Sequence, residues 1–163
     1  MTQRHLGLLV IVTGILMTSS SAIAASDPVV TALSVRHMTA TTEQLEGLAG
    51  GADALVAKLL ELRSDENTPF VGIRAEKYLL QYADRPEVAA ALDQDVKSDT
   101  MVGLARVIAM NVDKIPSAKA RQSLAQSVID RGKQQTEFKP YAQALTSSSD
   151  PEVSALARAA FGG

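Results

Sequence analysis

The side chains that most often perform catalysis or bind metals are scarce in this chain of 163 residues. It has no cysteine and two histidines, of which only His37 lies beyond the N-terminal segment. Without cysteine there are no disulfides, thiolate metal ligands or cysteine nucleophiles. A lone histidine cannot supply a histidine-rich metal site, and we expect His37 to be exposed. The sequence also lacks a Gly-x-Ser-x-Gly elbow, a phosphate loop and a dinucleotide fingerprint.

Two pairs of carboxylates have a spacing that acid–base catalysis could use. They are Glu43 with Glu46, and Glu61 with Asp65. Helix surfaces carry such pairs routinely, and nothing in the sequence brings either pair into a cleft. We therefore interpret both pairs as ordinary surface residues.

Residues 93–99 contain aspartates at a spacing that suggests a calcium loop. An EF-hand would place a ligand at Lys97, its glycine at Ser98 and its closing glutamate at Leu104, so the pattern fails. The sequence thus predicts no catalytic, cofactor-binding or metal-binding residue. An enzyme with an unrecognised carboxylate site is the alternative to a non-catalytic protein.

Charge is unevenly distributed along the chain. Residues 27–99 carry 7 basic and 13 acidic side chains, whereas residues 114–139 carry 6 basic and 2 acidic ones. Such an imbalance can steer a partner, although it more often marks a solvated surface. The candidate partner contacts are the polar strip Arg74, Lys77 and Gln81, and the pair Lys119 and Arg121. The basic run lacks interleaved aromatic residues, so we do not expect nucleic-acid binding.

The elements that must position these side chains are organised around residues 101–112, which contain a single charge, Arg106. A helix that is apolar nearly all round belongs in a core, with neighbours on several sides. At about 18 Å it is too short to span a bilayer, which takes roughly 20 apolar residues. We interpret it as the central helix of a helical domain, in which Arg106 snorkels or pairs with a carboxylate.

Amphipathic segments precede and follow this helix. Asp27-Pro28 and Asp150-Pro151 have the N-cap and N1 residues of helix starts, Gly50-Gly51 stops a helix, and Gly132 is placed to end another. With three Tyr, three Phe and no Trp, the core must be aliphatic and rich in alanine. That composition suits close-packed helices better than strands, so the predicted fold class is all-α.

The helical segments look like one unit used repeatedly. Residues 71–75 (Val-Gly-Ile-Arg-Ala) return as residues 102–106 (Val-Gly-Leu-Ala-Arg), 31 positions later. Residues 85–88 (Arg-Pro-Glu-Val) return as residues 150–153 (Asp-Pro-Glu-Val). A Ser-Asp pair also precedes several of the predicted helices.

Residues 150–161, with their Asp-Pro-x-Val start, resemble the short bacterial form of the HEAT repeat, and residues 68–75 resemble it more loosely. The resemblance covers roughly residues 51–161. It departs from the family at Ser154 and Ala89, where an arginine is expected, and in a long gap between the last two units. It implies a short right-handed α-solenoid of antiparallel helix pairs, with an irregular helical bundle as the alternative. The resemblance carries no catalytic residues, because family members mostly bind partners.

Residues 1–25 have the pattern of a signal peptide. A short basic start at Arg4 precedes an apolar run at residues 6–17, and small residues then lead to a predicted cleavage site after Ala24 or Ala25. An uncleaved anchor is the alternative, but an apolar run of about 12 residues is short for a membrane span. Because there is no twin arginine, we expect the general bacterial export route and a periplasmic or secreted protein.

These observations combine into one set of expectations. Residues 1–25 form a cleaved signal peptide, residues 26–50 an N-terminal extension with helical potential, and residues 51–163 a HEAT-like helical repeat domain. The expected function is an exported, non-catalytic protein-interaction module, a scaffold or adaptor, that binds another protein and keeps no stable membrane anchor after cleavage. The alternatives are the carboxylate enzyme and a small envelope-stabilising or inhibitor protein.

Overall fold

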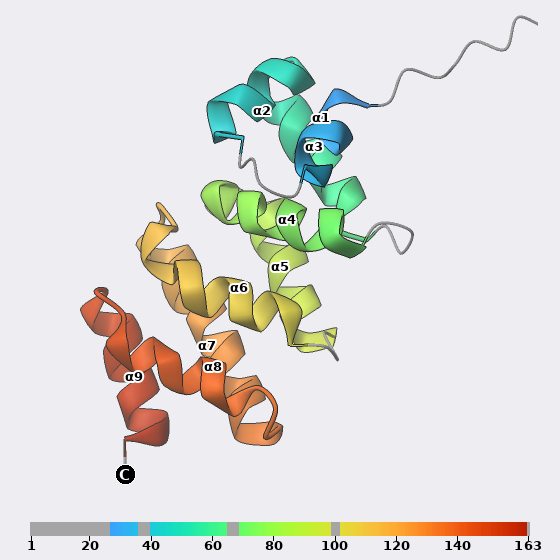
Figure 1. Cartoon of the computed structure of the whole chain (residues 1–163). Helices are drawn as coiled ribbons and strands as arrows, with labels where there is room; N and C mark the ends of the chain where they lie inside the picture. Colours follow the sequence, from blue (N-terminus) through green and yellow to red (C-terminus); the bar gives the residue numbers. More distant parts are fainter. Residues whose placement is uncertain (1–26, 36–39, 65–68, 99–101, 163) are drawn as a thin grey trace, which may run out of the picture.

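A computed structural model describes residues 27–35, 40–64, 69–98 and 102–162 of the chain. Throughout these residues the regular secondary structure is helical (Figure 1), which confirms the all-α prediction. The α-helices are α1 (Pro28–Ser34), α2 (Thr42–Ala49), α3 (Ala52–Leu62), α4 (Pro69–Leu79), α5 (Pro86–Ser98), α6 (Gly103–Asn111), α7 (Ala118–Gln134), α8 (Lys139–Ala144) and α9 (Pro151–Phe161). Short 3-10 helices, η1 (Leu80–Tyr82), η2 (Val112–Lys114) and η3 (Leu145–Ser147), follow α4, α6 and α8.

The predicted signal peptide, residues 1–25, lies outside the described residues, as does His37. Among the helices that are described, none combines the length and hydropathy needed to cross a membrane.

Helix boundaries follow the local signals in the sequence. Asp27 caps α1 by accepting the N–H of Val29 at 2.9 Å, and Pro28 occupies the first helical position. Thr41 and Gln44 form a capping box at the start of α2, with the Thr41 N–H donating to Oε1 of Gln44 at 2.8 Å. Gly50 ends α2 with a φ of 88°, a left-handed conformation that costs glycine little. The start of α1 and the end of α2 are where the sequence predicts them.

The helices stack in two rows (Figure 1). In the first row α4 contacts α6, and α6 contacts α8. In the second row α3 contacts α5, α5 contacts α7, and α7 contacts α9. The two rows face each other through contacts such as those of α3 with α4 and of α7 with α8, while α1 and α2 pack at the α3–α4 end. The aliphatic core lies between the rows.

Segments related by the sequence repeat fall in the same row. Residues 71–75 lie in α4 and residues 102–106 begin α6, both in the first row. Residues 85–88 begin α5 and residues 150–153 begin α9, both in the second row. Each pair of related segments therefore lies in helices of the same row.

The helix expected to be buried all round is open on one face. Leu104, Ala105 and Ile108 of α6 are buried, but Arg106 is exposed and the side chain of Met110 is 68% exposed. The expectation of burial on every side is therefore wrong for this outer face. A first-row helix is covered by the second row and by its row neighbours, and its remaining face meets solvent. The longest described helix is α7, with 17 residues, and it contacts α5, α6, α8 and α9.

The sequence predicts that Gly132 ends a helix. This prediction is wrong, because α7 continues to Gln134. Instead the glycine is buried where α7 meets α8 and the end of α9. A Cβ atom at this position would lie 2.5 Å from Cβ of Ala142 and 3.2 Å from Cζ of Phe161. The missing side chain thus allows a close approach of helices.

The close contact of α7 with α8 at Gly132 predicts opposite effects of alanine substitution on stability at two helical glycines. We expect Gly132→Ala to lower the free energy of unfolding by about 1–3 kcal/mol, because the added methyl overpacks the α7–α8 contact. The control, Gly47→Ala in α2, has open space around its Cβ and should raise the free energy of unfolding by about 0.5–1 kcal/mol. Urea unfolding followed by circular dichroism measures both, and the same sign for both variants would contradict the packing role of Gly132.

Candidate functional site

Glu46 and Glu61, one from each carboxylate pair considered for catalysis, are each held by a neighbouring side chain. Glu46 accepts a hydrogen bond from the Tyr82 hydroxyl at 2.6 Å, and Glu61 pairs with Lys58 at 3.1 Å. Burial and the hydrogen bond to Glu46 raise the pKa of Tyr82 far above its ordinary value, so the phenol stays protonated. Asp65 lies outside the described residues. Glu46 thus takes part in a contact between α2 and η1, and Glu61 in an ion pair within α3.

The aspartates from residue 93 onward do not form a calcium loop. Residues 93–98 belong to α5, so their backbone carbonyls belong to a helix rather than to a coordinating loop. Asp99 lies outside the described residues. In the part of the chain that the structure describes, no three His, Asp or Glu side chains are grouped as metal ligands would be.

Of the basic residues proposed as partner contacts, some bind other parts of the chain and others are exposed to solvent. Arg74 donates from Nη1 to the carbonyl oxygens of Leu33 and Val35, the latter at 2.8 Å, and so binds the end of α1. Lys77 and Lys119 are exposed. The polar strip on α4 is thus partly used in holding α1 against α4.

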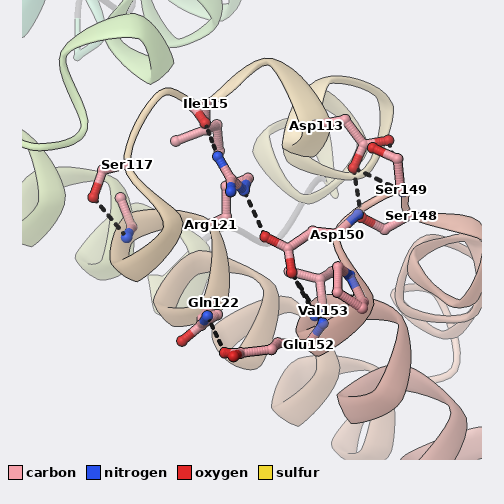
Figure 2. A network of polar contacts seen from close by, with 12 residues as sticks. Asp113, Ile115, Ser117, Arg121, Gln122, Ser148, Ser149, Asp150, Glu152 and Val153 are labelled. Carbon is pink, nitrogen blue, oxygen red and sulfur yellow. Dashed lines mark hydrogen bonds and ion pairs between the residues drawn. The ribbon is translucent and has the colours of Figure 1, made fainter.

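Arg121 belongs to a polar network that joins α7 to the start of α9 (Figure 2). Its Nε donates to Asp150 at 2.7 Å, and its Nη1 donates to the carbonyl oxygen of Ile115 at 2.6 Å. Asp150 also caps α9, and its side chain is only 8% exposed. Nearby, Asp113 accepts the backbone N–H of Ser149 at 3.1 Å. Arg121 is therefore a structural residue, not a free partner contact.

Hydrogen bonding in this network lowers two pKa values. The hydrogen bond from Arg121 holds the pKa of Asp150 below its ordinary value, with help from the backbone N–H of Val153. The hydroxyl of Ser148 has the same effect on the pKa of Asp113 and outweighs the opposing effect of burial. Both groups are anions at neutral pH.

Polar side chains also join each second-row helix to the next. The pairs are Arg63 with Asp95, Asp93 with Ser127, and Gln122 with Glu152. They cross from α3 to α5, from α5 to α7 and from α7 to α9 in turn. Successive helices of this row are thus held in register by hydrogen bonds as well as by the core.

A groove of about 600 Å³ lies between α5 and α7 and is the best candidate for a binding site. One wall is a stripe along α7, with side chains repeating every three or four residues. This stripe comprises Ser123, Gln126, Ser127, Asp130, Arg131 and Gln134. The other wall is formed by Asp93 and Lys97 of α5. Every lining side chain is polar or charged.

Asp93 joins the two walls of the groove. Its carboxylate accepts the hydroxyl of Ser127 at 2.5 Å and the ammonium group of Lys97 at 2.6 Å. Burial raises the pKa of Asp93, but these two hydrogen bonds outweigh burial and leave the pKa below its ordinary value. An aspartate that remains ionised suits a binding surface better than the role of a general acid.

Compared with protein-family models, curated proteins and solved structures, the chain gives no match.

Sequence reasoning did not find this groove. In the sequence Asp93 belongs to the failed calcium pattern, and its partner Ser127 lies 34 residues away. The polar positions 123, 127, 130 and 134 do share one side of α7, which indicates a solvent-facing stripe. Only the packing of α5 beside α7 turns that stripe into the wall of a groove.

Proposed function

We propose that this chain is a short right-handed α-solenoid of the HEAT type that acts as an exported, non-catalytic protein-interaction module. The observation that carries the proposal is the two-row stack, in which sequence-related segments lie in helices of the same row. Stacked helix pairs of this kind give an extended surface that is suited to binding a protein segment. The polar groove between α5 and α7 provides such a surface on the second row.

Export is the second part of the proposal and rests on residues 1–25. Their basic start, apolar run and small-residue cleavage motif are what a signal peptidase needs. The absence of cysteine is compatible with an oxidising compartment, because no thiol is exposed to unwanted pairing. We place the mature protein in the periplasm or outside the cell.

Photo-cross-linking in the source cells tests the interaction. A photoreactive amino acid is placed singly at Lys77, Lys119, Ser123 and Ser147, which are exposed on different parts of the stack. We expect a discrete adduct with a distinct protein from at least one position, recovered mainly from the cell envelope or medium. If no position gives an adduct above that of an unrelated exported helical protein, the proposed function is wrong.

A further inference from the structure

We propose that the groove between α5 and α7 binds an extended, polar peptide segment of about five residues. This inference rests on the proposed function, because it names the site and the kind of partner that the module would bind.

The length of the occupant follows from the length of the α7 stripe. Ser123 and Gln134 are three helical turns apart, which corresponds to about 16 Å along the helix axis. An extended chain advances roughly 3.3 Å per residue, so about five residues lie along the stripe. The groove runs beside α7 and is walled on its other side by one turn of α5, between Asp93 and Lys97. A linear ligand fits such a trough better than a round one.

The chemistry of the walls favours an extended backbone over a helix. An extended segment leaves its backbone N–H and C=O groups unpaired, and each needs a partner when it is covered. Gln126 and Gln134 offer amide donors and acceptors, and Ser123 offers a hydroxyl. A docked helix has already satisfied its backbone and binds through an apolar stripe in an apolar groove. This groove has no apolar lining residue for such a stripe to contact.

The charges of the groove favour a partner that is neutral overall. Two acidic and two basic side chains line it, so their formal charges cancel. Asp93 is held by Lys97, Asp130 accepts from Gln126 at 2.8 Å, and the guanidinium of Arg131 lies 4.5 Å from the ring centroid of Phe138. A polyanion such as a nucleic acid needs an excess of basic residues and is therefore disfavoured. Side chains already held by neighbours lose little freedom on binding, which favours affinity.

Peptide selection with the purified chain tests this inference. The probe is a phage-displayed library of random linear peptides, and the best peptide is resynthesised with a fluorophore for anisotropy titration. We expect Ser123→Trp to weaken peptide binding roughly tenfold or more, because the indole fills the groove. Ser123 is exposed and its hydroxyl makes no hydrogen bond in the described part of the chain, so folding is preserved. Thermal melting of the variant verifies this.

The matched control is Ser147→Trp, which places the same indole at an exposed serine of η3, away from the groove. It should change peptide affinity by less than about twofold. Equal weakening by both variants would overturn the groove as the binding site. A peptide that becomes helical on binding, seen by circular dichroism, would overturn the extended occupant.

The two proposals fail in different ways. If selection yields no peptide that binds, the groove inference is wrong, while adducts from the cross-linking experiment would still support an interaction module. If cross-linking yields no adduct at any surface position, the proposed function itself is wrong, whatever peptides are selected in vitro.

Discussion

Truncating Phe138 to alanine is expected to lower the free energy of unfolding by about 3–5 kcal/mol. The ring is 1% exposed and is the largest fully buried side chain in the described structure. It lies at the turn between α7 and α8 and packs beneath the guanidinium of Arg131. In an aliphatic core rich in alanine, few neighbouring side chains are large enough to fill the cavity left behind. Urea unfolding followed by circular dichroism measures the loss.

Phe70→Ala is the matched control for this prediction. The chemical change is the same, but the Phe70 side chain is 77% exposed at the start of α4. Its removal should change the free energy of unfolding by less than about 0.5 kcal/mol. Similar losses for the two variants would contradict the burial assigned to Phe138.

Replacing Arg121 with alanine is expected to lower the melting temperature by roughly 5–10 °C at neutral pH. The guanidinium contacts both Asp150 and the carbonyl oxygen of Ile115, so its loss leaves a nearly buried carboxylate without its cation. The α9 cap and the α7–α9 contact weaken together. The control is Lys119→Ala, which removes an exposed cation from the same helix and should shift the melting temperature by less than about 2 °C.

The contact between Arg121 and Asp150 also predicts how the melting-temperature difference between the natural chain and Arg121→Ala depends on pH. Because the pKa of Asp150 is lower in the folded chain than its ordinary value of about 3.9, the unfolded chain binds protons more readily. The stabilisation is fully present above about pH 5, and is lost as the pH falls through the folded pKa. The gap in melting temperature between the natural chain and Arg121→Ala should therefore narrow below about pH 4. A gap that stays constant across this range would show that Arg121 acts through packing alone.

Local signals predicted most of the helix starts and stops, because capping depends on residues that are close in sequence. Asp27 and Asp150 each cap a helix whose first residue is proline, and Gly50 ends α2 in a left-handed conformation. Each of these features forms within one helical turn and needs no tertiary partner. The same locality explains why a calcium loop at residues 93–99 can be rejected from spacing alone.

Longer-range features were missed or misread where two helices must meet. Gly132 looks like a helix stop from its residue type, yet its role depends on how closely Ala142 approaches it. Arg121 looks like a free surface cation, although Asp150, 29 residues away, accepts its hydrogen bond. Neither partner can be read from local spacing, because contacts between helices depend on how the rows pack.

The sequence by itself thus determined the all-α class and the helix caps at Asp27 and Asp150, since both follow from periodicity and local hydrogen bonding. Only the tertiary structure decided which polar residues became structural and which line a groove. Asp93 and Ser127 have unremarkable places on their own helices, and they meet only because α5 packs against α7. The physical reason is that a groove belongs to the space between two elements, whereas periodicity describes each element alone.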